Sequence, residues 1–189
     1  MRICVFGASG TQLEDVYIKE TEALGRTLAQ RGHSLIFGGG KNGLMGAAAR
    51  GFTEGGGRIV GVAPGFFKEA GVLYPLCDEF VWPDSMRDRK KYMEDNADAF
   101  IVTPGGIGTY EEFFEVLTLK QLARMSKPIA VFNVNGFYDS LYRLILDNTE
   151  NGFIRRQTAE LFRMCDTVEE TVDCVENDTY DIGKIRFAD

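Results

Sequence analysis

The segment with the clearest chemical potential is residues 104–112, which has the sequence PGGIGTYEE. A short apolar run, residues 98–102, precedes it and predicts a buried strand, whereas the residues after it have helical periodicity. Glycine lets backbone N–H groups approach a ligand closely, and a helix turns its unpaired N–H groups and its positive dipole end toward the same point. The segment therefore predicts an anion site in a strand-to-helix turn, with a phosphate as the expected anion.

Thr109 and Glu112 in this segment allow two interpretations. They have the Thr-x-x-Glu spacing of a capping box, in which each side chain satisfies the other's backbone N–H. Alternatively, Glu112 points past the phosphate toward an attached sugar, because a carboxylate aimed at the cradle would repel the anion. In that position it would stabilise positive charge developing at the anomeric carbon and orient a water molecule.

A second group of chemically useful side chains lies in residues 85–96, which have a helical pattern. Arg89 follows Met86 by three residues and precedes Met93 by four, so it lies on the apolar face. One interpretation is an arginine that extends along an ordinary amphipathic helix to reach solvent. The other is a guanidinium that binds a phosphate or keeps Glu112 ionised through a bidentate pair.

Residues 38–46, with the sequence GGGKNGLMG, form another glycine-rich turn between a predicted strand and a predicted helix. Their spacing differs from the G-x-G-x-x-G dinucleotide fingerprint, and no acid follows the next strand to bind a ribose diol. Mononucleotide binding, dinucleotide binding, and glycines kept for turn and packing reasons all stay open. The lysine and hydroxyl of a P-loop are missing, so we do not expect hydrolysis of nucleoside triphosphates.

The elements that must position these motifs alternate between apolar runs and helical patterns. The apolar runs lack polar/apolar alternation, which is typical of strands buried on both faces. We therefore expect one α/β domain over residues 1–189, with a mostly parallel sheet of about seven strands covered by helices on both faces. The expected strands are residues 2–6, 33–37, 58–62, 79–82, 99–103, 129–132 and 161–165, and the expected helices are 13–31, 44–54, 85–96, 109–125 and 136–148.

Ligands of parallel sheets bind at the carboxyl ends of the strands. Residues 7–10, 38–46 and 104–112 each follow a predicted strand, so we expect these loops to converge on one crevice. His33, the only histidine, begins a strand and lies at the opposite end, where we expect a surface or edge position. We therefore predict neither histidine catalysis nor a metal site.

Composition narrows the class of partner. The net charge of -7 disfavours a nucleic-acid or anionic membrane surface, so a small molecule is the expected ligand. Cys4, Cys77, Cys165 and Cys174 have no C-x-x-C spacing, and we expect reduced thiols. No signal-peptide pattern and no apolar run of about 18 residues is present, which predicts a cytoplasmic protein that does not enter a membrane.

Taken together and in this order, GGG with GLMG at 38–46, M-x-x-R-K at 86–90 and PGGxGTxxE at 104–112 resemble the Lonely Guy (LOG) family. The similarity runs from about the first strand to about residue 175. Members are cytokinin riboside 5′-monophosphate phosphoribohydrolases, and some relatives carry the label "possible lysine decarboxylase". The resemblance implies a Rossmann-like homodimer without a cofactor. It implies hydrolysis of the N-glycosidic bond of adenosine monophosphate or its N6-modified analogues to free base and ribose 5-phosphate.

The resemblance also implies roles for individual residues. Arg89 and Glu112 match the catalytic pair of the family. The positions implied to bind the nucleotide substrate are Ser9, Gly39, Gly40, Met86, Lys90, Gly105, Gly106, Gly108 and Thr109. The chain departs from the family pattern at Ala8, within a loop that often has the sequence C-G-S-S, and at Arg87, where the pattern M-H-x-R-K has histidine. These departures bear on the contribution of Ser9 and on the base that fits.

Two other functions are compatible with the fold. A non-catalytic nucleotide-binding or carrier module would use the same cradle without turnover. A pyridoxal phosphate decarboxylase would need a Schiff-base lysine, and no lysine has a sequence context that indicates one. The helix after the glycines is apolar around much of its circumference, which suits burial against a second subunit as well as against the sheet.

Overall fold

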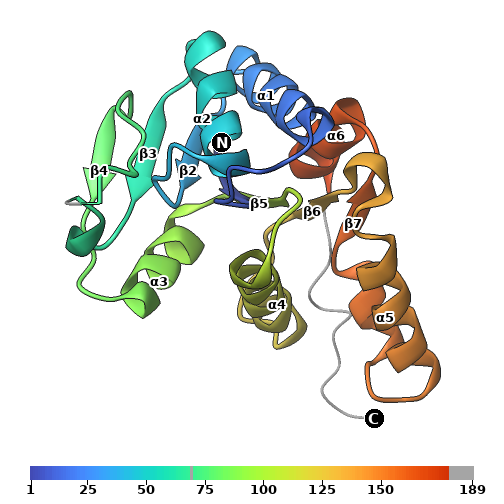
Figure 1. Cartoon of the computed structure of the whole chain (residues 1–189). Helices are drawn as coiled ribbons and strands as arrows, with labels where there is room; N and C mark the ends of the chain where they lie inside the picture. Colours follow the sequence, from blue (N-terminus) through green and yellow to red (C-terminus); the bar gives the residue numbers. More distant parts are fainter. Residues whose placement is uncertain (69, 179–189) are drawn as a thin grey trace.

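A parallel sheet of seven strands forms the centre of the computed structural model (Figure 1), which describes residues 1–68 and 70–178. The strand order is β4-β3-β2-β1-β5-β6-β7, and each neighbouring pair is parallel. The predicted α/β class and sheet are therefore confirmed. The strands are β1 (Arg2–Phe6), β2 (Ser34–Phe37), β3 (Ile59–Val62), β4 (Glu79–Val81), β5 (Ala99–Val102), β6 (Ile129–Phe132) and β7 (Arg163–Cys165).

The central strands are buried on both faces, as their unbroken apolar sequences predict. In the register of the sheet, Cys4 of β1 is paired with Ile36 of β2 on one side and with Phe100 of β5 on the other. None of these three side chains is more than 2% exposed. Strands of this kind need a helical layer on each side of the sheet.

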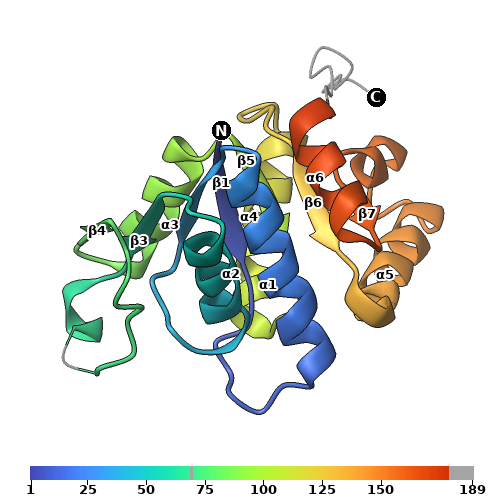
Figure 2. The same ribbon diagram turned by 90° about the horizontal axis from the view of Figure 1, so that it is seen from above.

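Helices cover both faces, in three layers (Figures 1 and 2). Leu24, Phe52 and Val172, from α1, α2 and α6, share one apolar core with the sheet. Met93, Phe113 and Ile145, from α3, α4 and α5, belong to the core on the other face. The helices are α1 (Asp15–Gln30), α2 (Gly43–Glu54), α3 (Met86–Asn96), α4 (Ile107–Gln121), α5 (Asp139–Glu150) and α6 (Val168–Asn177), with short 3-10 turns η1 (Gly65–Phe67), η2 (Val134–Gly136) and η3 (Arg156–Glu160).

The strand order reverses direction at β1, which pairs with β2 on one side and with β5 on the other. A switch of this kind leaves a crevice at the carboxyl ends of β1 and β5, because the loops that follow these two strands diverge to opposite faces of the sheet. The loops are joined at their base, since the Ala8 N–H donates to the Pro104 carbonyl at 3.1 Å and the Thr103 N–H donates to the Phe6 carbonyl at 2.9 Å.

Several element bounds differ from the sequence prediction by a few residues, and three differences matter for the description of the fold and the site. Helix α4 begins at Ile107 rather than at Thr109 and ends at Gln121. Helix α6 was not expected, although Thr167 and Glu170 form a capping box at its start. His33 lies at the predicted end of the sheet but is buried rather than at the surface, and its Nε2 is 2.9 Å from Glu176 Oε1.

The remaining sequence features fit this architecture. Cys4, Cys165 and Cys174 are buried, Cys77 is half-buried, and all four are free thiols. Within the described ranges, no helix is both long enough and apolar enough to cross a membrane.

Candidate active site

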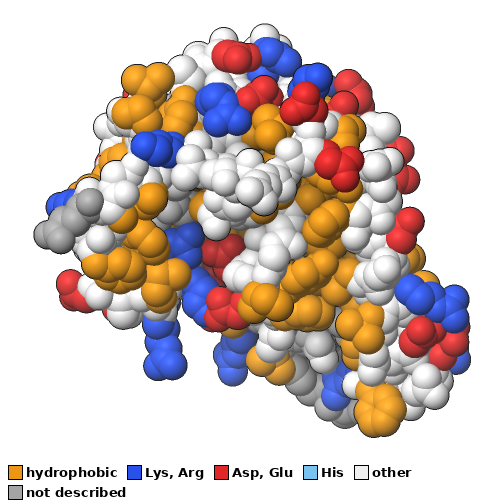
Figure 3. All heavy atoms as spheres, in the orientation of Figure 1, with side chains coloured by type: hydrophobic (Ala, Val, Ile, Leu, Met, Phe, Trp, Pro, Cys, Tyr) orange, Lys and Arg blue, Asp and Glu red, His pale blue; other side chains and the backbone are white. Residues whose placement is uncertain are grey.

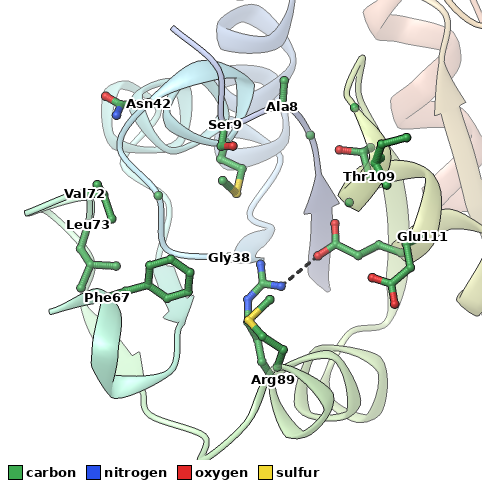
Figure 4. Close-up of a pocket in the computed structure, with 18 residues that line it drawn as sticks. Ala8, Ser9, Gly38, Asn42, Phe67, Val72, Leu73, Arg89, Thr109 and Glu111 are labelled. Atoms are coloured by element: carbon green, nitrogen blue, oxygen red, sulfur yellow. Dashed lines mark hydrogen bonds and ion pairs between the residues drawn. The ribbon is translucent and has the colours of Figure 1, made fainter. Parts of the chain in front are cut away.

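A cavity of about 520 Å³ lies at the carboxyl ends of β1, β2 and β5 (Figure 4). The loop after β1 contributes Ser9, the loop after β2 contributes Gly40, and the turn before α4 contributes Gly106. Met86 and Arg89 of α3 also line the cavity. The predicted convergence of the three glycine-rich loops on one crevice is therefore confirmed.

The loop after β2 is held against the loop after β1 by backbone contacts. The Ala8 carbonyl accepts hydrogen bonds from the N–H groups of Leu44 at 2.8 Å and Met45 at 3.3 Å. Gly43 has a φ of +59°, and a Cβ at this position would lie 2.3 Å from the Ala8 oxygen. A side chain at residue 43 would therefore push the two loops apart and widen the cavity.

The amino-terminal end of α4 opens into the cavity. Gly106 is the N-cap, no side chain caps the helix, and its first turn contains no acidic residue. Ile107, Gly108 and Thr109 line the cavity, so the N–H groups that a helix leaves unpaired in its first turn are available there to an anion. Because Thr109 is already the third residue of α4, the capping-box interpretation of Thr109 and Glu112 is wrong.

Arg89 and Glu112 form an ion pair in the cavity wall, and the dashed line from Arg89 in Figure 4 marks it. Arg89 Nη1 donates to Glu112 Oε1 at 3.0 Å, and Arg89 Nε donates to the carbonyl of Val62, the last residue of β3, at 3.1 Å. The two side chains are only 9% and 12% exposed. The interpretation of Arg89 as a solvent-seeking arginine is therefore wrong.

The position of the guanidinium depends on Gly38, the first residue after β2. A Cβ at Gly38 would lie 2.0 Å from Arg89 Nη2 and 3.2 Å from its Cζ. The absence of a side chain at residue 38 thus makes room for Arg89. Gly38 lines the cavity but is not among the site residues predicted from the sequence.

The environment of Glu112 shifts its protonation equilibrium. Burial raises the pKa of Glu112, and the positive charge of Arg89 opposes that rise. Arg89 thus stabilises the carboxylate form of a side chain that burial alone would favour as the neutral acid. A buried carboxylate beside an arginine, in a cavity with a helix amino terminus, can stabilise a developing cation or accept a proton from water.

The side of the cavity opposite Thr109 and Glu111 is apolar (Figure 4). Phe67, Val72 and Leu73 come from the segment between β3 and β4 and line this wall. None of these three residues is among the site residues predicted from the sequence. The only sequence signal was their apolar type in a segment without helix or strand periodicity.

Three of the predicted substrate-binding residues are not among the residues that line the cavity. Gly105 faces a neighbouring cavity of about 470 Å³, which shares Ser9 and Gly106 with the first. Gly39 has a φ of +77° and accepts a hydrogen bond from the Tyr74 N–H through its carbonyl. Lys90 contacts Glu111 and Glu115 of α4.

A family model described as "Possible lysine decarboxylase" matches residues 45–175, which include α3, the turn before α4 and both members of the Arg89–Glu112 pair. The chain belongs to this family. The predicted family is thereby confirmed, because curated relatives of the chain carry the LOG name.

Three relatives illustrate the sequence similarity within the possible lysine decarboxylase family. The probable cytokinin riboside 5′-monophosphate phosphoribohydrolase LOGL5 of Oryza sativa subsp. japonica is 40% identical over 81% of this chain, which spans 62% of that relative's length. The cytokinin riboside 5′-monophosphate phosphoribohydrolase LOG2 of Arabidopsis thaliana is 37% identical, with 81% of this chain and 72% of that one covered. LOG of Oryza sativa subsp. japonica is 35% identical, with coverages of 97% and 77%.

Solved structures support the fold of this family member. A molybdenum cofactor binding protein of Rippkaea orientalis has a TM-score of 0.72 at 21% identity, with 93% of this chain and 94% of that chain covered. A molybdenum cofactor carrier protein of Chlamydomonas reinhardtii has a TM-score of 0.71 at 20% identity, with 93% and 95% covered. At these identities the likeness concerns the fold alone.

The decarboxylase label of the family is not matched by the chemistry of the cavity. A pyridoxal phosphate enzyme needs a lysine that forms a Schiff base with the cofactor. Among residues 1–68 and 70–178, those that line the cavity include one basic side chain, Arg89, and no lysine. The acidic side chains in the same set are Glu111 and Glu112.

Proposed function

We propose that this chain is a phosphoribohydrolase that cleaves the N-glycosidic bond of adenosine monophosphate or an N6-modified, cytokinin-type nucleoside 5′-monophosphate. The products are the free base and ribose 5-phosphate. The observation that carries the proposal is the largely buried Arg89–Glu112 pair beside the amino terminus of α4 in one cavity. Membership of a family with curated relatives named as phosphoribohydrolases supports the same reaction.

The phosphate binds at the start of α4. Gly106, Gly108 and Thr109 offer backbone N–H groups there, and the hydroxyls of Thr109 and Ser9 lie on the same cavity. Gly40 lines the cavity beside them. Gly39 and Gly105 do not contact the substrate in this proposal. They determine the shape of the loops that carry the hydrogen-bond donors.

The sugar lies beside Glu112. Cleavage of an N-glycosidic bond passes through an oxocarbenium-like state, whose positive charge a nearby carboxylate stabilises. The bond from C1′ to the base nitrogen breaks, a water oxygen bonds to C1′, and the proton released from water goes to the departing base. Glu112 orients the water, and Arg89 keeps the carboxylate ionised and in place.

The base lies against the apolar wall. Phe67, Leu73 and Met86 line that part of the cavity and offer contacts to a planar ring and to an apolar N6 substituent. A cavity of about 520 Å³ is within the usual range for small-molecule sites, roughly 300–1,000 Å³.

The phosphate requirement gives the main test of this proposal. We expect purified protein to release adenine from adenosine monophosphate, and to act on adenosine at least about 100-fold less efficiently in kcat/KM, because the remote phosphate holds the sugar in place. Base release is measured by chromatography across a panel of nucleoside monophosphates and their nucleosides. Equal turnover of adenosine and its monophosphate would contradict the role given to the α4 amino terminus.

The alternative is a non-catalytic nucleotide-binding or carrier module of the same fold. Two proteins of similar fold, at 21% and 20% identity, are named for binding or carrying the molybdenum cofactor, so the fold itself does not distinguish binding from turnover. Binding of adenosine monophosphate, measured by calorimetry, without any release of adenine after prolonged incubation would favour this alternative.

We further propose that the protein is a cytoplasmic homodimer. Apolar side chains gather over α4 and between α4 and α5 (Figure 3). The exposed apolar residues of the two helices and their ends include Phe114, Leu122 and Leu144, at 39%, 46% and 53% exposure. Such a patch suits an interface between two copies. Light scattering should give twice the mass of the chain, and Leu122→Lys should shift it toward the monomer. A monomer at all concentrations would contradict the dimer.

The four free thiols are compatible with a reducing compartment such as the cytoplasm. Cell fractionation tests the proposed cytoplasmic location.

A further inference from the structure

Lys90 follows Arg89 on α3 but faces a different set of groups. Its Nζ forms ion pairs with Glu111 and, at 2.7 Å, with Glu115. Only 15% of the Lys90 side chain is exposed, and it is not among the cavity-lining residues. The lysine thus lies behind the cavity wall, where it joins α3 to two carboxylates of α4.

The two carboxylates matter because one of them belongs to the cavity. Glu111 lines the cavity next to Glu112, whose partner is Arg89. Without Lys90, Glu111 and Glu115 would lose the cation that neutralises them, and their charges would add to that of Glu112 beside the proposed phosphate site. Other groups that interact electrostatically with this cluster include Glu94 of α3, which interacts with Glu115 and Lys90, and the buried thiol of Cys4 on β1, which interacts with Glu112 and Arg89.

We propose that Lys90 is a positioning residue, which neutralises Glu111 and Glu115 and fixes α3 against α4 so that the Arg89–Glu112 pair keeps its alignment and charge. It acts through these carboxylates and does not contact the substrate. The inference rests on the proposed function for the identity of the substrate, but the electrostatic arrangement can be measured without turnover.

Each neighbouring charged group shifts the pKa of Glu112 in a definite direction. After burial, which raises the pKa of Glu112, and Arg89, which lowers it, Glu111 raises that pKa further and Lys90 lowers it. Removing Lys90 takes away a lowering charge and leaves Glu111 unbalanced, so the pKa of Glu112 rises. A larger fraction of Glu112 is then protonated at a given pH, and the acidic limb of the activity profile moves to higher pH.

The test replaces Lys90 by Met. At neutral pH we expect kcat/KM for adenosine monophosphate to fall about fivefold, the scale of one partly exposed ion pair, and to fall further as the pH decreases. Lys90→Arg, which keeps the charge, should restore most of the activity. Lys91→Met is the matched control, because Lys91 is the next residue, also pairs with an acid, Asp95, and is exposed.

A second substitution separates neutralisation from direct phosphate binding by Lys90. Adding Glu111→Gln to Lys90→Met should return the acidic limb toward that of the wild type, and Glu111→Gln alone should move it to lower pH. If Lys90 instead binds the phosphate, Lys90→Met raises KM, leaves the acidic limb in place, and is not rescued by Glu111→Gln. That result would overturn the inference while the proposed function survives.

Carbon-13 NMR of the glutamate side chains gives a readout that does not need activity. The Glu112 signal is assigned from its loss in Glu112→Gln, and its titration should shift upward in Lys90→Met but not in Lys91→Met. An unchanged Glu112 titration in folded Lys90→Met protein would refute the inference even if the enzyme proved inactive on nucleotides. A shifted titration in a protein that releases no base would support the inference and refute the proposed function.

Discussion

Glu112→Gln will lower kcat for adenosine monophosphate by about 10²–10⁴-fold, the usual cost of losing a group that stabilises charge or moves a proton in the transition state. The substitution keeps the size of the side chain, and the amide oxygen of glutamine can still accept the hydrogen bond that Arg89 Nη1 gives to Glu112 at 3.0 Å. What it removes is the negative charge. The measurement is steady-state base release, together with a thermal unfolding midpoint that shows the fold is retained.

The pH profile gives the same prediction a second readout. Burial raises the pKa of Glu112 despite the opposing charge of Arg89. If the carboxylate is the active form, wild-type activity is lost as the pH falls through this raised pKa, so the acidic limb lies above the usual range of a glutamate. The residual activity of Glu112→Gln should lack that limb.

A control distinguishes loss of catalysis from loss of an arginine–glutamate pair in general. Glu22 of α1 pairs with Arg50 of α2 at 2.6 Å and is 27% exposed, away from the cavity. Glu22→Gln should therefore leave kcat within about twofold of the wild type while it weakens the contact between α1 and α2. A Glu112→Gln protein that is destabilised but fully active would assign Glu112 a structural role and end the case for this mechanism.

The sheet could be predicted from the sequence because its strands are buried on both faces. Runs such as residues 99–103 have no polar alternation and are bounded by turn-forming residues, so their type and their positions along the chain could be predicted. Their order within the sheet was not predicted from the sequence. The observed strand β5, Ala99–Val102, ends one residue earlier. The convergence of the loops also followed, because the carboxyl ends of parallel strands meet at one edge of the sheet.

The Thr-x-x-Glu spacing shows where local sequence rules reach their limit. At Thr167 and Glu170 it forms a capping box, which opens a helix that the sequence analysis did not predict. At Thr109 and Glu112 the same spacing forms none, because Gly106 starts the helix three residues earlier and Arg89, from another element, pairs with Glu112. Tertiary contacts decide whether a capping box forms, and these contacts cannot be predicted from the Thr-x-x-Glu spacing alone.

The apolar wall of the cavity could not be predicted for a related reason. Its segment between β3 and β4 has little regular structure and is placed by contacts with the loop after β2. The Lys41 N–H donates to the Val72 carbonyl at 2.8 Å, and the Tyr74 N–H donates to the Gly39 carbonyl at 2.8 Å. These contacts join residues about thirty positions apart, which periodicity within a short window cannot detect.

Arg89→Met is the second substitution with a large expected effect, about 10²–10³-fold in kcat/KM. Methionine keeps the apolar contacts of the α3 face but removes the guanidinium, so Glu112 becomes a buried carboxylate without a partner. Since Arg89 lowers the pKa of Glu112, its removal raises that pKa, and the acidic limb should move to higher pH. Base release between pH 5 and pH 9 measures both effects.

Gly38→Ala tests the position of the guanidinium without removing it. The added methyl would lie 2.0 Å from Arg89 Nη2. Arg89 cannot move away easily, because its Nε donates a hydrogen bond to the Val62 carbonyl at 3.1 Å. We expect a loss of activity in the same direction as Arg89→Met, whereas Gly65→Ala, which adds a methyl with no atom within 4 Å, should have little effect. Full activity in both Arg89→Met and Gly38→Ala would mean that the arginine contributes only to packing, and the mechanism would then have to work with an unpaired Glu112.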